Sequence, residues 1–147
     1  MFNNLKFECL KSGYDQELKD QYNYITPDMD YIITVKDNIK DLCVWMSSNG
    51  NFDFHIKNVI SKVKQHIGWI RRSFMTNNPH FRKFMWRNYI SGLLDYNSQI
   101  WSPVEESKVS SIKQLLRSYT ANTSGMELYN YWERLKIMGI MSIQRRF

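Results

Sequence analysis

The stretch DFHIKNVISKVKQHIGWIRRSF, residues 53–74, decides how the chain is organised. On a helical wheel its apolar residues share an arc of roughly 100°, the width of a stripe that faces a core. The stretch therefore predicts one long amphipathic helix, with Asn51 or Asp53 as the N-cap. The residues of the stripe are Ile56, Val59, Ile60, Val63, Ile67, Ile70 and Phe74.

Three more helices are expected after this one. Pro79 suits the first turn of a second helix that continues to about Gln99. That helix is apolar nearly all round, which predicts a central place in a bundle. Ser102-Pro103 would end it, and the pattern returns in a third helix at 105–120. A short fourth helix is expected at 130–138, followed by a final turn at 141–147.

The residues before this stretch predict strands and turns instead. Runs of β-branched and aromatic residues favour strands near 4–10, 19–25, 31–35 and 39–46. A cluster of turn-forming residues at 47–50 closes this part. The expected fold class is thus α+β, with short β-strands in residues 1–50 and a basic three- to four-helix bundle in residues 51–147.

Charge divides the chain at nearly the same place. Residues 1–51 carry 5 basic and 8 acidic groups, whereas residues 52–147 carry 15 basic and 6 acidic groups. The whole chain has a net charge of +6. Such a basic half favours a polyanionic partner.

Within that half, Lys57, Lys64 and Arg71 recur at intervals of seven and form one line along the predicted helix. Arg72 lies beside this line. The spacing of the line is that expected of a surface that follows a phosphate backbone. The alternative interpretation is an ordinary solvated face. Trp69 falls opposite the apolar stripe, where it would either pack on another element or stack on nucleic acid.

The sequence offers no pattern for metal or acid–base chemistry. His55, His66 and His80 are too far apart to share a helical face as zinc ligands, and we expect them on helix surfaces. Nucleotide-binding glycine motifs and the GxSxG motif are absent. Cys9 and Cys43 predict reduced thiols, typical of a cytoplasmic or nuclear protein. The longest uncharged run, residues 42–52, is too short to span a membrane, so a membrane is not an expected partner. Because catalytic and nucleotide-binding motifs are absent, a small-molecule substrate is not expected either.

Four segments, in order along the chain, resemble motifs of the reverse transcriptases of non-LTR retrotransposons, specifically jockey-like mobile elements. The family patterns are FNxxKxE, KDLGV…S…F..HI, LEYCSQIWSP and YxERL…LGLxSLxxRR. The matching segments are FNNLKFE at 2–8, DNIKDLCVWMS at 37–47 with Phe52 and His55-Ile56, LDYNSQIWSP at 94–103, and YWERLKIMGIMSIQRR at 131–146. Together they cover almost the whole chain.

The resemblance implies a fragment consisting of the end of the palm, a primer-grip hairpin around Leu42, Cys43 and Val44, and a helical thumb. The family's catalytic aspartates, including the YxDD pair, precede the segment matched here, so the chain is expected to start after them. Lys6 matches a palm lysine proposed as a proton donor, which is inert without those carboxylates and the Mg²⁺ of the full-length enzyme.

For function, the resemblance implies that the chain is a truncated RNA-directed DNA polymerase. Such a fragment is expected to be inactive by itself. The expected partners are an RNA–DNA or DNA duplex and the missing palm and fingers. Lys57, Lys64, Arg71 and Arg72 are the expected duplex contacts. Cys43 departs from the family by replacing a glycine. The alternative is a domesticated or decayed protein-interaction module without nucleic-acid function.

Overall fold

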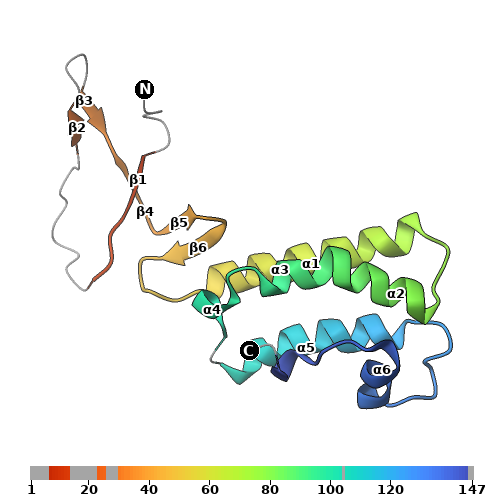
Figure 1. Ribbon diagram of the computed structural model, residues 1–147. Helices are drawn as coiled ribbons and strands as arrows, with labels where there is room; N and C mark the ends of the chain where they lie inside the picture. Colours follow the sequence, from red (N-terminus) through yellow and green to blue (C-terminus); the bar gives the residue numbers. More distant parts are fainter. Residues whose placement is uncertain (1–6, 14–22, 26–29, 104, 146–147) are drawn as a thin grey trace. The chain divides into compact units, whose positions relative to one another are not determined.

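A computed structural model describes residues 7–13, 23–25, 30–103 and 105–145. The structure is α+β, with short strands first and helices after them (Figure 1). The chain divides into two compact units, residues 1–55 and 56–147. The sequence predicted a division after Gly50. The boundary between the two units lies between residues 55 and 56, within the first turn of the first helix.

The first unit is built from short strands that pair two by two. Among the described residues, β1 pairs in parallel with β4, β2 antiparallel with β3, and β5 antiparallel with β6. An ion pair between Lys36 and Glu8 joins β4 to β1. The bounds are β1 Glu8–Leu10, β2 Asn23–Ile25, β3 Asp30–Ile32, β4 Thr34–Lys36, β5 Asn38–Asp41 and β6 Val44–Ser47.

The prediction of a single strand at 39–46 is wrong, because this segment folds back on itself as the β5–β6 hairpin. Its two-residue turn consists of Leu42 and Cys43, whose φ values are 43° and 67°. Turns with positive φ at both positions normally use Asn or Gly, and neither residue signals a turn here. The predicted strand at 31–35 is divided between β3 and β4. Residues 4–6 and 19–22 of the other predicted strands lie outside the described residues.

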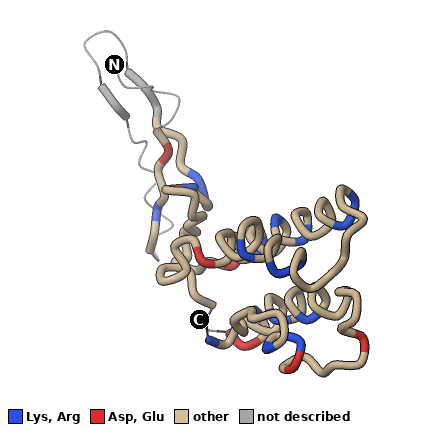
Figure 2. The backbone as a smooth tube through the Cα atoms, turned by 45° about the vertical axis from the view of Figure 1, so that its right-hand side comes forward, with Lys and Arg blue, Asp and Glu red and all other residues tan. Residues whose placement is uncertain are grey.

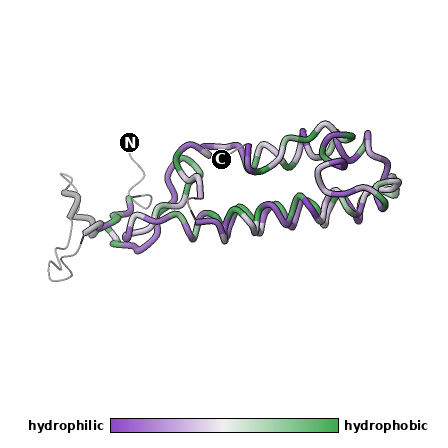
Figure 3. Tube along the Cα trace, turned by 90° about the horizontal axis from the view of Figure 1, so that it is seen from below, coloured by the Kyte–Doolittle hydropathy of each residue, from purple (hydrophilic) through white to green (hydrophobic). Residues whose placement is uncertain are grey.

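The helices predicted at 53–74, 105–120 and 130–138 are confirmed to within one residue at each end. Apolar and polar residues alternate along the helices, as Figure 3 shows. The expected turn near the end is a short 3₁₀ helix. The bounds are α1 Asp53–Ser73, α2 Pro79–Met85, the π-helix η2 Trp86–Ile90, α3 Ser91–Asp95, α4 Ser98–Trp101, α5 Glu106–Ala121, α6 Tyr131–Met138 and η3 Ile143–Arg145.

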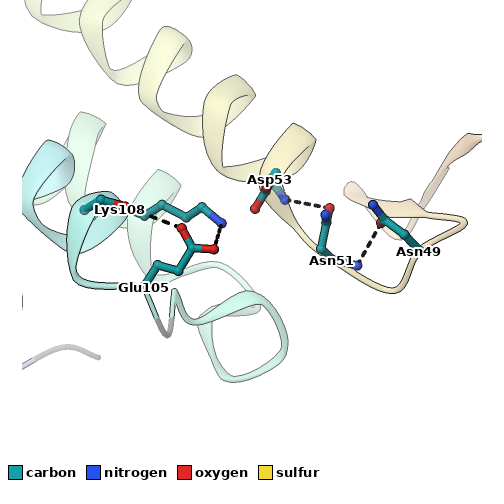
Figure 4. A network of polar contacts seen from close by, with 6 residues as sticks. Asn49, Asn51, Asp53, Glu105 and Lys108 are labelled. Carbon is teal, nitrogen blue, oxygen red and sulfur yellow. Dashed lines mark hydrogen bonds and ion pairs between the residues drawn. The ribbon is translucent and has the colours of Figure 1, made fainter.

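Side-chain to backbone hydrogen bonds stabilise the residues just before α1 and its first residue (Figure 4). Asn49 Oδ1 accepts a hydrogen bond from the N–H of Asn51 at 3.1 Å, and Asn51 Oδ1 accepts one from the N–H of Asp53 at 3.3 Å. Asp53 is therefore the first helical residue and not the cap. Asn51 satisfies one of the N–H groups that a helix start leaves without an intrahelical partner.

The second predicted helix differs most from expectation. It runs without a break from α2 through η2 to α3, but ends at Asp95, because Tyr96 adopts an extended conformation and Asn97 a left-handed one with φ 50°. The sequence predicted a central place in the bundle, and the helix does contact both α1 and α5. It is not buried on all sides, however. Phe84 is 57% exposed and Tyr89 45% exposed, so one face of this helix is open.

Aromatic contacts hold the helical unit together. Trp69 and Phe74 of the α1 segment contact Tyr89 and Phe81 at ring distances of 5.9 and 5.1 Å, which pairs α1 with the α2–α3 helix. The α2–α3 helix also packs on α5, because the rings of Trp86 and Tyr119 lie 5.1 Å apart. Figure 1 shows the resulting order, with α1 beside α2–α3 and with α5 and α6 below them. The most deeply buried side chains are Val63, Ile70, Trp86, Ile90, Leu94, Trp101, Ile112, Leu116, Tyr119, Met138 and Ile143.

One histidine prediction is wrong, because His55 is buried, with an exposed fraction of 4%. Its Nδ1 accepts a hydrogen bond from the N–H of Trp45 at 3.3 Å. The Trp45 ring meets Phe54 edge-on at 5.0 Å. Within the first unit, these contacts join the β5–β6 hairpin to the first turn of α1. A helical wheel could not show this, since the partners of His55 lie on the preceding strand.

Candidate nucleic-acid interface

Four cations that the sequence singled out, Lys57, Lys64, Arg71 and Arg72, are all exposed along α1. We call them the α1 cation line. Lys and Arg recur along this helix in Figure 2, while Asp53 at its start is its one acidic residue. From Lys57 to Arg71 the line extends over roughly 21 Å, at 1.5 Å per residue.

Gly68 leaves room for the Arg72 side chain beside the helix. A Cβ atom at Gly68 would lie 3.3 Å from Nη1 of Arg72, so the guanidinium group lies over this glycine. Helical side chains point toward the N-terminus and meet the residue four positions before them. Spacing alone places Arg72 about 100° away from Arg71 on the wheel. The spacing of the cations does not show this contribution of Gly68, although a glycine between two cations in a helix is a visible signal.

Several cations outside α1 are engaged in contacts within the protein. Lys113 lies over the ring of Trp132 at 5.8 Å, and Arg117 lies over the ring of Tyr131 at 5.1 Å. Lys108 forms an ion pair with Glu105 at 3.0 Å, drawn in Figure 4. These contacts attach α6 to α5 and stabilise the start of α5. The charges that make them are partly used in holding the fold.

The α1 cation line differs from these cations. In the ranges that the structure describes, its four side chains form no ion pair, no cation–π contact and no hydrogen bond to a protein group. The acidic residues of the helical unit lie on other elements, at helix ends and in loops: Asp95, Glu105, Glu106, Glu127 and Glu133. An exposed cation without a protein partner can contact a phosphate without first breaking a contact inside the protein.

Trp69 packs within the protein, as one of its two interpretations predicted. Its ring meets Phe74 edge-on at 5.7 Å and Tyr89 at 5.9 Å. It still has an exposed fraction of 42%, and with His66 it lines a shallow pocket of about 410 Å³. The helical wheel separates Trp69 from Lys57 by about 120°, so a base stacked on this ring would not lie on the cation line.

The hairpin residues expected to grip a primer lie in contrasting environments. Leu42 is 77% exposed at the turn and Cys43 is also exposed, but Val44 is buried at 4%. Only the first two can present a side chain to a ligand. Both cysteines, Cys9 and Cys43, are free thiols. Lys6 lies outside the described residues.

Arg82 is a cation whose environment the sequence did not predict. It is 3% exposed, and its guanidinium carbon lies 4.4 Å from the centre of the Tyr119 ring. Its Nη2 donates to the carbonyl oxygen of Asn122 at 3.1 Å, and the Tyr119 hydroxyl donates to the Arg82 carbonyl oxygen at 2.8 Å. The partners follow Arg82 by 37 and 40 residues, so no local spacing could indicate them.

Burial sets the acid–base properties of this pair. Loss of hydration lowers the pKa of Arg82, the nearby Tyr119 opposes that effect, and the charge of Arg71 adds to it. Burial also raises the pKa of Tyr119 to about 12, while Arg82 acts in the opposite direction. The Tyr119 hydroxyl therefore keeps its proton, and with it the hydrogen bond to Arg82, well above neutral pH.

Two of the segments that carry the family resemblance contribute residues to the core. Trp101, from the segment 94–103, is fully buried and its Nε1 donates to the Tyr96 carbonyl oxygen at 2.8 Å. Tyr131 and Leu135, from the last segment, are buried as well. These residues help to hold the helices in place.

Within the described ranges, no cluster of three or more His, Cys, Asp or Glu side chains is arranged to hold a metal ion. In the same residues, no helix combines the length and the apolar character needed to cross a bilayer.

Comparison with protein-family models, with curated proteins and with solved structures finds no match for this chain. The resemblance to reverse transcriptases therefore rests on the four sequence segments alone.

Proposed function

We propose that this chain is the duplex-binding part of a non-LTR retrotransposon reverse transcriptase, and that its helical unit acts as a thumb. The observation that carries the proposal is the α1 cation line: four exposed cations on one helix, without protein partners in the described part of the chain, in a half of the sequence with 15 basic and 6 acidic groups. Phosphate contacts of this kind give affinity without base specificity.

The order of the four sequence segments supports the same proposal. A thumb follows the palm and the primer grip along the chain, and here the helices follow a hairpin whose exposed turn consists of Leu42 and Cys43. The sequence contains no YxDD motif. Two-metal nucleotidyl transfer needs carboxylates that hold both ions, so purified chain given primed RNA, dNTPs and Mg²⁺ should show no template-dependent extension.

Titration of an RNA–DNA hybrid at several salt concentrations tests duplex binding. If four phosphates are neutralised, log K should fall with log salt at a slope of about −3.6, from about −0.9 per contact. Reversal of Lys64 and Arg71 to Glu should bring the slope to about −1.8 or closer to zero and lower the affinity at every salt concentration.

Lys62→Glu is the matched control for these reversals. Lys62 is an exposed cation on the same helix, but the wheel places it about 140° from Lys57. Its reversal changes the net charge without touching the line, so the slope should stay near that of the unaltered chain. Equal losses for Lys62→Glu and Lys64→Glu would show attraction by net charge only, and would contradict a specific surface.

A protein-interaction module is the second candidate function. It is favoured by the open face of the α2–α3 helix, where Phe84 and Tyr89 are exposed, with Tyr96 and Ile100 following them. An absence of hybrid binding at low salt would favour this candidate over duplex binding.

A further inference from the structure

A polar pocket of about 400 Å³ lies where α1 ends and the chain turns into α2. Arg71 and the turn residues Thr76 and Asn77 form its outer part, and Arg82 and Asn122 line it as well. Two of its lining residues are arginines and none is acidic. The outer residues are exposed, so the pocket is accessible from solvent.

The turn that forms the pocket is held in place by backbone and side-chain contacts. Asn77 Nδ2 donates to the carbonyl oxygen of Asn122 at 2.7 Å, and the N–H of Ser124 donates to the carbonyl oxygen of Asn77 at 2.9 Å. Asn122 Nδ2 donates in turn to the Ser118 carbonyl oxygen at 2.8 Å. These bonds connect the start of α2 to the end of α5, so the residues that line the pocket are held in place by tertiary contacts.

The charge of Arg82 is incompletely compensated there. In the residues that the structure describes, its guanidinium group contacts one carbonyl oxygen and the ring and hydroxyl of Tyr119, all without a full negative charge, and its buried Nε has no hydrogen-bond partner. A buried cation without a carboxylate is costly, since neither a carbonyl nor a ring carries a full negative charge. Arg71 adds a second positive charge at the same pocket.

We propose that this pocket binds a phosphate group between Arg71 and Arg82. Guanidinium groups present several N–H donors in a fixed plane, and two of them match the oxygens of a tetrahedral dianion. The bound phosphate would supply the negative charge that Arg82 lacks. The other side of the phosphate faces solvent, so it can belong to a nucleic-acid strand or be free.

This pocket is separate from the α1 cation line, although Arg71 belongs to both. It depends on Arg82, which lies on α2, and it needs no contact from Lys57 or Lys64. The two proposals can therefore fail independently: loss of hybrid binding leaves the pocket intact, and an empty pocket leaves the cation line intact.

NMR of the arginine side chains tests the pocket in the full chain. Sodium phosphate is added against sodium chloride at constant ionic strength, while the Nε–H signal of Arg82 is followed. A saturable shift with phosphate but not with chloride is expected, because a phosphate bound to the guanidinium group changes the electrostatic field at this buried N–H, which has no partner in the described structure. No shift, or the same shift with chloride, would overturn the proposal.

Arg71→Gln and Arg72→Gln form a matched pair of variants. Both residues are exposed neighbours at the end of α1, but only Arg71 lines the pocket. Loss of one charged hydrogen bond should weaken phosphate binding about tenfold in Arg71→Gln. Arg72→Gln should bind phosphate like the unaltered chain, and equal weakening in both would contradict the pocket. Replacing Arg82 is less informative, because it also removes contacts to α5.

The same signal distinguishes the two sources of phosphate. Addition of an RNA–DNA hybrid with and without a 5′-phosphate follows the inorganic titration. A shift with both hybrids assigns the pocket to a backbone phosphate, and a shift that needs the 5′-phosphate assigns it to a strand end. A shift with inorganic phosphate alone assigns it to a free ion.

Discussion

The turn of the β5–β6 hairpin holds two residues in backbone conformations that favour glycine. Cys43 has φ 67° and Leu42 has φ 43°. In the left-handed region a Cβ atom costs about 1 kcal/mol or more. Cys43→Gly should therefore stabilise the hairpin by about 1 kcal/mol. Hydrogen exchange of the β5 and β6 amides measures this gain directly.

Cys43→Ala is the control, because it removes the thiol but keeps the Cβ atom. It should leave the exchange rates of the hairpin nearly unchanged. A gain for alanine equal to that for glycine would mean that the thiol, and not the backbone, limits the stability of the turn.

Tyr119 should make the stability of the helical unit sensitive to alkaline pH. Burial raises its pKa to about 12, from an ordinary value of 10.0. Between these values the unfolded chain loses the phenolic proton while the folded chain keeps it. The contribution of Tyr119 is thus fully present below pH 10 and is lost as the pH rises toward 12.

Urea unfolding of Tyr119→Phe at pH 9 and pH 11 measures this effect. At pH 9 the variant should be less stable by about 1 kcal/mol, because the hydrogen bond to the Arg82 carbonyl oxygen is lost. The difference should shrink or reverse at pH 11. Tyr129→Phe, at an exposed position, is the control. A difference for Tyr119→Phe that is the same at both pH values would contradict the linkage.

At the scale of elements, α6 depends on its capping box. Asn130 Oδ1 accepts from the N–H groups of Trp132 and Glu133, both at 3.0 Å, and Glu133 Oε2 accepts from the N–H of Asn130 at 2.9 Å. Asn130→Ala should cost about 1 kcal/mol in thermal or urea unfolding. Asn130→Ser, which keeps an acceptor, should cost less, and equal costs would place the effect outside the cap.

The elements that the sequence predicted correctly are those with local signals. Pro79 at the start of α2, Gly139 at the end of α6 and the apolar spacing of α1 each act within one or two turns. The break at Asn97 had no such signal, because a left-handed residue inside an apolar segment leaves the apolar pattern intact. The strand pattern did not show the turn at Cys43 for the same reason, and only the family resemblance placed a hairpin around Leu42, Cys43 and Val44.

The two candidate sites also differ in whether local sequence signals reveal them. The cation line was predictable, because seven-residue spacing on one helix fixes its geometry. The phosphate pocket was not predictable, because Arg82 acquires its environment from Tyr119 and Asn122, on α5 and just after it. No property of the segment around Arg82 indicates that its side chain is buried.

At the scale of the whole molecule, the two units differ in how they are stabilised. In the described residues of the first unit, every strand pairs with only one other strand, and four of its strands are three residues long with open edges. Isolated two-stranded pairs of this length are marginally stable in water. The helical unit has several helices around a core with fully buried side chains such as Trp86 and Leu116.

Hydrogen exchange should therefore show two levels of protection in the intact chain. Amides of α5 around Leu116 should exchange only through global unfolding of the helical unit, whereas those of β1 and β4 should exchange through local opening with a free energy near zero. The β5–β6 hairpin should be intermediate, because Trp45 and His55 attach it to the first turn of α1. Low concentrations of urea should accelerate amide exchange steeply in α5 and hardly at all in β1, since only global unfolding exposes much surface. Protection of β1 and β4 equal to that of α5, with the same urea dependence, would show that the units unfold together and would contradict this division.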